Sequence, residues 1–133
     1  MKTHPVVVPH PDGYKATWPQ WPRAFALFSK SGDRVSVTDI FRDPGQPKGS
    51  AGSMLADAFA MAGIRHPKVI RMSNILESQP TLAELAAGKR PAETVLGKTL
   101  SALVNESGGT IKEWRHGIDN RGKPWLEVEV GSP

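Results

Sequence analysis

The stretch EWRHGIDNRGKPWLEVEV, residues 113–130, has the pattern of a β-hairpin, and the fold assignment starts from it. Alternating side chains on both sides of DNRGK predict two antiparallel strands, at residues 110–118 and 123–130. In the turn, Gly122 occupies a position that needs a positive φ, as in a three-residue loop with a bulge. The chain therefore ends in an antiparallel hairpin.

Two registers are compatible with this hairpin. The bulged turn pairs Asp119 with Lys123 and sets Arg115 opposite Glu127. A two-residue turn at Asn120 and Arg121 would move every partner by one and exchange the two faces. Because Asn-Arg is a poor pair for a type I′ turn, the bulged register is favoured. It gathers the following side chains on one face of the hairpin: Trp114, His116, Ile118, Leu126, Val128 and Val130.

Composition restricts the class of protein. The 133 residues, 38% of them hydrophobic, suit one domain with its own core. The absence of cysteine excludes disulfides, thiolate catalysis and Cys-based metal sites. No apolar run approaches the roughly 18 residues of a membrane span. The net charge of +4 favours acidic partners such as RNA. No membrane partner, no metal and no cofactor are therefore expected.

The beginning of the chain is rich in proline. Residues 1–22 contain Pro5, Pro9, Pro11, Pro19 and Pro22, which exclude a helix there. We expect residues 1–22 to form an extended arm, which Trp18 or Trp21 pins to the domain. Residues 23–133 would then be a single domain.

The remaining segments predict the fold class. A hairpin is expected over residues 24–42 and a strand at KVIRMSN. Helices are expected at residues 53–62, at QPTLAELAAG and at residues 93–106, from apolar spacing and capping residues. The order β-β-α-β-α-α-β-β indicates an α+β domain whose mainly antiparallel sheet is covered on one face by helices.

The C-terminal hairpin brings together the residue types that cleave RNA without a metal. His116 is the candidate general acid or base, Glu127 the partner carboxylate and Arg115 the cation on the phosphate. Trp114 and Trp125 are candidates for stacking on an unpaired base. The alternative is structural, because a packed histidine and a cross-strand Arg–Glu pair are common in sheets.

Two further segments carry candidate substrate-binding residues. Lys98 and Thr99 in LGKTL offer an ammonium and a hydroxyl for a phosphate, although the context of a P-loop is missing. The alternative for them is a solvated helix side. Arg71 alternates with apolar residues in KVIRMSN and predicts a polar strand face, for phosphates or for solvent.

The runs GSAGSMLADAFAMAGIRHPKVIRMSNI, TLAEL, VLGKTL, GGTIKEW and RGKPWLEVEV resemble C-terminal toxin domains of bacterial polymorphic secreted toxins, of the rearrangement-hotspot and contact-dependent inhibition types. The resemblance covers residues 34–130. Many such domains are similar to the superfamily of barnase, EndoU, colicins and RelE, in which a C-terminal sheet cleaves RNA. The resemblance implies a metal-independent ribonuclease, with catalysis carried over to His116, Arg115 and Glu127.

The resemblance also implies partners and a place of action. It predicts an RNA substrate, a cognate immunity protein, delivery from a producing cell and action in the cytoplasm of a competitor. Two other functions stay open. One is a different toxin enzyme, with ADP-ribosyl or nicotinamide-nucleotide chemistry, and the other is a non-enzymatic binding or immunity module.

Overall fold

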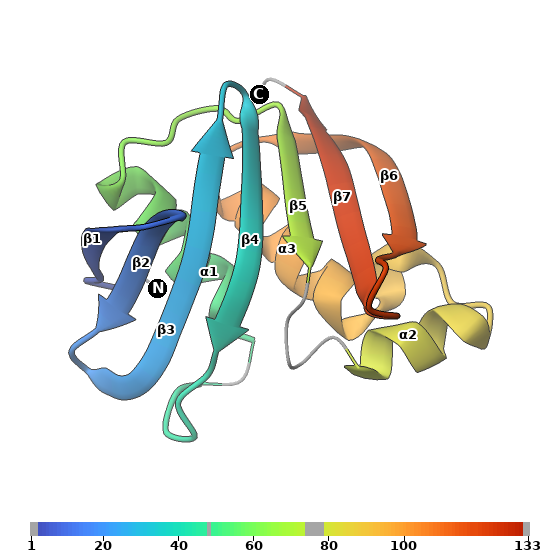
Figure 1. The fold of residues 1–133 in the computed structure, drawn as a ribbon, viewed down its shortest axis with the longest axis horizontal. Helices are drawn as coiled ribbons and strands as arrows, with labels where there is room; N and C mark the ends of the chain where they lie inside the picture. Colours follow the sequence, from blue (N-terminus) through green and yellow to red (C-terminus); the bar gives the residue numbers. More distant parts are fainter. Residues whose placement is uncertain (1–2, 48, 74–78, 132–133) are drawn as a thin grey trace.

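A computed structural model describes residues 3–47, 49–73 and 79–131 of the chain. Its sheet has seven strands in the order β1-β2-β3-β4-β5-β7-β6 (Figure 1). The strands are β1 (Val6–His10), β2 (Gly13–Trp18), β3 (Trp21–Ser31), β4 (Arg34–Phe41), β5 (Val69–Ser73), β6 (Thr110–Ile118) and β7 (Pro124–Gly131). The helices are α1 (Ala51–Met61), α2 (Gln79–Ala86), the 3-10 turn η2 (Pro91–Glu93) and α3 (Val95–Glu106).

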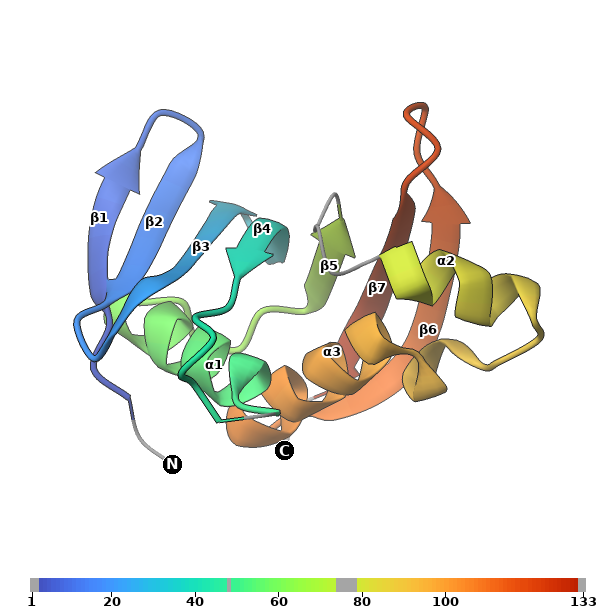
Figure 2. The same ribbon diagram turned by 90° about the horizontal axis from the view of Figure 1, so that it is seen from below.

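The helices lie on one side of the sheet, so the predicted α+β class is confirmed (Figure 2). Apolar side chains of α1 and α3 pack on every second residue of the inner strands, which is the periodicity of a half-buried sheet. Examples are Met54 and Leu55 of α1, Leu100 and Leu103 of α3, and Val37 of β4, each at most 1% exposed. We call the opposite side, which α1 and α3 do not cover, the open face.

The proline-rich segment differs from its prediction as an arm. Residues 6–18 form the hairpin β1–β2, and β2 pairs with β3, so the segment is part of the sheet. Proline is tolerated here because β1 is an edge strand and does not need every N–H. Trp18 is 1% exposed and donates its indole N–H to Thr3 Oγ1 at 3.1 Å, so the tryptophan contact predicted for this segment is present.

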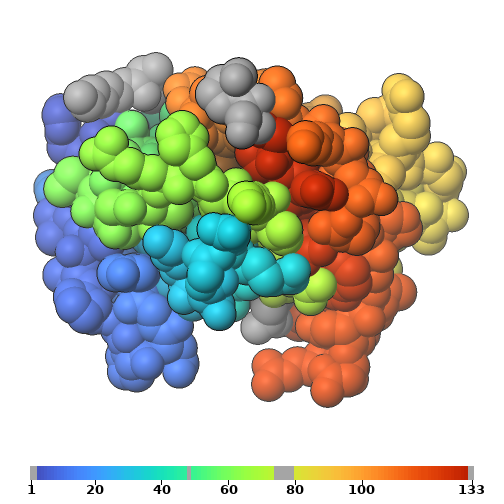
Figure 3. Space-filling view, turned by 90° about the horizontal axis from the view of Figure 1, so that it is seen from above, coloured from blue at the N-terminus to red at the C-terminus, as the bar shows by residue number. Residues whose placement is uncertain are grey.

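The C-terminal hairpin has the predicted bulged turn. The N–H of Asp119 donates to the Lys123 carbonyl at 2.9 Å, and Gly122 has a φ of 77°. Arg115 consequently lies opposite Glu127, as expected. Both this hairpin and β1–β2 project on the open side of the sheet, away from the helices (Figures 2 and 3).

Candidate functional site

Strands β4 and β5 form a parallel pair that stays together over part of its length. Four residue pairs are formed, from Arg34 with Val69 to Val37 with Met72. Strand β4 continues to Phe41 without a further partner on this side among the described residues. On the side of β5, the backbone edge of residues 38–41 thus has no partner in the part of the chain that the structure describes, and we call this place the opening.

A β-bulge causes β4 to leave β5. On its other side β4 pairs Val37 with Phe28 and Asp39 with Leu27, so Thr38 is an extra residue without a partner. A bulged strand bends and twists more strongly than a regular one. Because the extra residue falls directly after Val37, the bend begins where pairing with β5 ends. Figure 1 shows the two strands diverging below this point.

The loop that follows β4 is held by two polar side chains. The Asp43 carboxylate accepts the N–H groups of Arg23 at 2.9 Å and Gly45 at 2.8 Å, and these bonds lower the pKa of Asp43. Gln46 is 6% exposed, accepts the N–H of Asp43 at 3.0 Å and donates to Ser50 Oγ at 2.9 Å. These bonds hold residues 43–46 in place and connect Gln46 to Ser50, directly before α1.

The first turn of α1 presents its amide groups at the end of this loop. Met54 is the first residue of the helix whose N–H returns to the chain, to the Ser50 carbonyl at 3.0 Å. The amides of Ala51, Gly52 and Ser53 have no acceptor within the described residues, Ser50 makes no side-chain cap, and the first turn has no acidic residue. A helix N-terminus with free N–H groups attracts anions.

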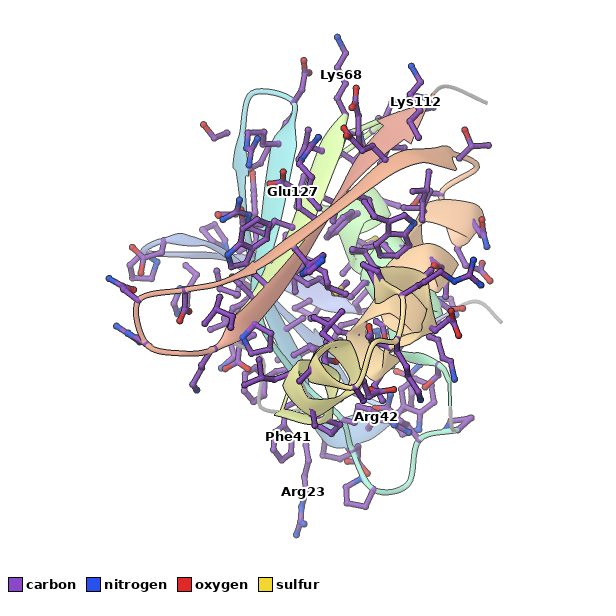
Figure 4. The ribbon with its side chains drawn as sticks, turned by 90° about the vertical axis from the view of Figure 1, so that its right-hand side faces the viewer. Arg23, Phe41, Arg42, Lys68, Lys112 and Glu127 are labelled. Carbon is purple, nitrogen blue, oxygen red and sulfur yellow. The ribbon has the colours of Figure 1, made fainter. Side chains whose placement is uncertain are left out.

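Arg42 adds a positive charge beside this loop. Its Nε is buried and has no hydrogen-bond partner in the described part of the chain. A buried donor without an acceptor is costly. Figure 4 shows Arg42 together with Phe41 at the end of the sheet opposite to Lys68. Within the described ranges, this end therefore combines helix amides without an acceptor, a guanidinium and a strand edge without a partner.

The chain topology at this end is that of a parallel crossover unit. Strand β4, helix α1 and strand β5 follow each other in a parallel β-α-β unit. In such units ligands bind beyond the carboxyl ends of the strands, with anionic groups at the helix N-terminus. In the sequence, this end of the unit corresponds to the glycine- and serine-rich run DPGQPKGSAGS, which lies between the strand and the helix.

Part of this run has a structural explanation. Gly49 has a φ of 81°, a backbone conformation that favours glycine. A Cβ on Gly52 would collide with Ala102 of α3, so this glycine allows α1 and α3 to pack closely. The close contact fixes the first turn of α1 against α3.

A buried carboxylate organises the open face beside the paired part of β4 and β5. Glu127 is 4% exposed; its Oε1 accepts from Arg34 Nη2 at 2.6 Å and from Arg71 Nε at 3.0 Å, and its Oε2 accepts from Arg115 Nε at 2.8 Å. Burial raises the pKa of Glu127, but the hydrogen bonds from Arg115 and Arg71 and the charge of Arg34 outweigh it and lower the pKa. The four side chains connect β4, β5, β7 and β6.

The predicted site residues fall in three places. Arg115 and Glu127 are on the open face, together with Arg71, whose guanidinium lies 4.0 Å from the centre of the Trp125 ring. His116 and Trp114 pair with Leu126 and Val128, which are buried residues of the helix side, so they point away from Arg115. Lys98 is exposed on α3, and the hydroxyl of its neighbour Thr99 bonds back to the Val95 carbonyl at 3.4 Å.

The structure therefore does not bring His116 to the Arg115–Glu127 pair, because consecutive residues of a strand point to opposite faces. Gly117 leaves room for the ring of Trp125 across the hairpin, since a Cβ there would collide with that ring. A catalytic or substrate-binding role for these residues stays a prediction.

Two hollows in the surface lie elsewhere. One of about 350 Å³ is lined by residues near the C-terminal ends of α1 and α3, including Asp57, His66 and Glu106. A smaller one of about 140 Å³ adjoins it at His66 and Pro67. Both are at the far end of α1 from its free amides. Among the described residues no group of three or more His, Cys, Asp or Glu side chains could hold a metal ion. No helix in the described ranges is long and apolar enough to cross a membrane.

Comparisons with known proteins gave few matches. No family model matches the chain, and no curated protein matches it. Solved structures that resemble it include an acetyltransferase of Bacillus subtilis in complex with coenzyme A, at 14% identity and a TM-score of 0.41, over 87% of this chain and 74% of that one. At these values the match establishes neither activity nor ligand for this chain.

These findings correct the interpretation as a toxin ribonuclease. The matched structure is an acetyltransferase, and no toxin family or curated toxin was found. The resemblance rested on the general residue pattern of short runs such as VLGKTL and RGKPWLEVEV. It did not rest on a motif that fixes the position of a catalytic residue. The nucleotide chemistry considered as an alternative has no support either.

Proposed function

We propose that this chain binds coenzyme A or an acyl thioester of it at the opening, and that it transfers the acyl group to an acceptor. The observation that carries the proposal is the bulge at Thr38, which separates β4 from β5 beside the free first turn of α1. Coenzyme A combines a diphosphate with an extended arm that contains amide groups. Each part meets a matching feature of the opening.

The anionic part of the ligand fits the helix end. The amides of Ala51, Gly52 and Ser53 can donate to a diphosphate, and the first turn has no carboxylate to repel it. The loop is already ordered by Gln46 and Asp43, so binding requires little additional ordering. Arg42, whose Nε has no hydrogen-bond partner among the described residues, adds a positive charge at the same end of the sheet (Figure 4).

The extended part fits the edge of β4. Residues 38–41 have backbone N–H and C=O groups without a partner on the β5 side within the described residues. An arm with amide groups can pair with such an edge as another strand would. This arrangement directs the thioester to the place where β4 and β5 separate, where an acceptor can approach from the open face.

A carboxylate lies near this place. Asp39 follows the bulge and pairs with Leu27, whose side chain belongs to the open face. We assign Asp39 as the group that accepts a proton from the attacking amine or hydroxyl. Holding both reactants in place supplies most of the remaining acceleration. The sequence predicts no cofactor, and the proposal departs from that expectation.

Calorimetric titration tests the binding step with three probes. Coenzyme A should bind at least tenfold more tightly than pantetheine, which lacks the phosphates, and than ADP, which lacks the arm. Arg42→Gln should weaken coenzyme A binding, whereas Arg65→Gln, an exposed arginine away from the opening, should not. Equal affinities for coenzyme A and pantetheine, or no binding at millimolar concentration, would contradict the proposal.

The transfer step has its own test. With acetyl-coenzyme A and a mixture of amine acceptors, the wild-type protein should release free thiol in an acceptor-dependent manner. Asp39→Asn should lower kcat by about 100-fold or more and leave the affinity for coenzyme A unchanged. A variant with wild-type kcat would remove Asp39 from the mechanism.

A further inference from the structure

Three guanidinium groups surround Glu127, which supplies one negative charge. Arg115 has two other carboxylates nearby, Glu113 at 2.7 Å and Glu129 at 3.9 Å. Arg34 and Arg71 share the single oxygen Oε1 and have no other carboxylate partner among the described residues. The β4–β5 side of the cluster therefore keeps an excess of positive charge.

The two arginines also keep unused donors. A guanidinium has five N–H donors in a planar fork that matches carboxylate and phosphate. Arg34 uses Nη2 and Arg71 uses Nε for the bonds to Glu127. The other nitrogens have no partner in the described part of the chain, and the side chains are 51% and 34% exposed.

Packing holds this pair in place. The Arg71 guanidinium stacks on Trp125, with 4.0 Å between its carbon and the centre of the ring. Hydrogen bonds to the buried Glu127 hold both Arg34 and Arg71. Figure 4 shows Glu127 in the middle of the sheet, well away from Arg42 at the other end. A fixed guanidinium loses less freedom on binding than a mobile one, so the pair is preorganised for an anion.

We infer that Arg34 and Arg71 form a binding site on the open face for the anionic group, carboxylate or phosphate, of a second ligand. Its identity as the acyl acceptor rests on the proposed function, whereas binding of the anion does not. Arg71 pairs with Ser36, two residues before Thr38. Two residues of strand span about 7 Å, so the acceptor is a small anionic molecule whose reactive group lies roughly that far from its charge.

Anion binding is measured first, without coenzyme A. Succinate and inorganic phosphate are the probes, and the readout is the indole N–H signal of Trp125, assigned from the spectrum of Trp125→Phe. Either anion should shift the signal in a saturable manner, and the preferred one identifies carboxylate or phosphate as the group. Arg34→Gln should weaken binding at least tenfold and Arg34→Lys by less, while Arg65→Gln should match the wild type.

Arg34 is half exposed and Glu127 keeps its bonds from Arg71 and Arg115, so the Arg34 variants should stay folded, which circular dichroism checks. No saturable shift with either anion, or equal affinity in Arg34→Gln, would overturn the inference. Coenzyme A titrations of the same variants keep the two proposals apart. Arg34→Gln should bind coenzyme A normally, and a wild-type protein that binds the anion but not coenzyme A would contradict only the proposed function.

The role as acceptor site is tested by paired substrates. With acetyl-coenzyme A, kcat/KM should be at least tenfold higher for 6-aminohexanoate than for 6-aminohexanamide, or for 4-aminobutyl phosphate than for 4-aminobutanol, because these chains have the required length. The preference should disappear in Arg34→Gln. Equal values within both pairs in the wild-type protein would overturn the assignment as acceptor site.

Discussion

The two ends of strand β4 differ in what holds them. At Arg34–Val37 the strand is paired on both sides, and Arg34 reaches across the sheet to Glu127. At residues 39–41 it is paired with β3 but not with β5. The difference comes from one extra residue rather than from hydrophobicity, because Ile40 beyond the bulge is as much part of the core as Val37. A strand can thus be fixed at one end and open to a ligand at the other.

Replacing Glu127 should produce the largest effect, because it breaks the paired end. Glu127→Gln leaves three guanidinium groups without their shared charge and should lower the free energy of unfolding by about 3 kcal/mol. Urea denaturation measures the change. Glu113→Gln, at an exposed site bound to the same Arg115, should cost no more than about 0.5 kcal/mol. Similar losses in both variants would show that Glu127 does not hold the paired end.

Low pH should destabilise the same paired end of β4. The pKa of Glu127 is lowered from its ordinary value of 4.5, so its contribution to stability is complete above that value and is lost as the pH falls through the lowered pKa. The difference in urea midpoint between wild type and Glu127→Gln should therefore be constant from pH 7 to about 5 and shrink below that. A difference that persists unchanged at pH 2 would contradict the pairing.

Deletion of Thr38 should close the open end. Without the extra residue the sequence RVSV-DIF alternates regularly, so Val37 and Ile40 both keep facing the core. The variant should remain folded by circular dichroism, extend its pairing with β5, and bind coenzyme A at least tenfold more weakly, a loss of about 1.4 kcal/mol. Unchanged affinity in a folded variant would separate the bulge from ligand binding.

A negative charge introduced into the first turn of α1 should have a smaller effect, on both protein stability and coenzyme A binding. Ser53→Asp places a carboxylate at the free helix end and should stabilise the unliganded protein by about 0.3 to 1 kcal/mol. The same charge should weaken coenzyme A binding, so the two effects have opposite signs. Ser53→Asn, which is similar in size and uncharged, is the control. Stabilisation without loss of affinity would place the phosphates elsewhere.

Several parts of the fold could be predicted from local chemistry. The glycine at 122 and the poor Asn120–Arg121 pair determine the register of the last hairpin, and the structure has that register. The prolines misled the prediction for residues 1–22 because they exclude a helix but not an edge strand. The local sequence does not determine which strand lies beside β4. The parallel pairing with β5 depends on contacts across the whole crossover.

The candidate site was harder to predict from the sequence than the fold. A sign of the bulge is present in RVSVTDIF, where the core-facing residues Val37 and Ile40 are three apart instead of two. Because that spacing also fits a strand end, it does not indicate an opening without knowledge of the neighbour. Arg34 was missed because its partner Glu127 is 93 residues away in the chain.

The edge strand β1 has a consequence for handling the protein. Val6 and Val8 are 49% and 46% exposed, and an apolar edge strand is a template on which other chains can add and aggregate. Pro9 sits in this strand, opposite Tyr14, and cannot donate a ladder hydrogen bond. The proline that obscured the strand in the sequence therefore interrupts the row of edge donors on which the strand of another molecule could pair.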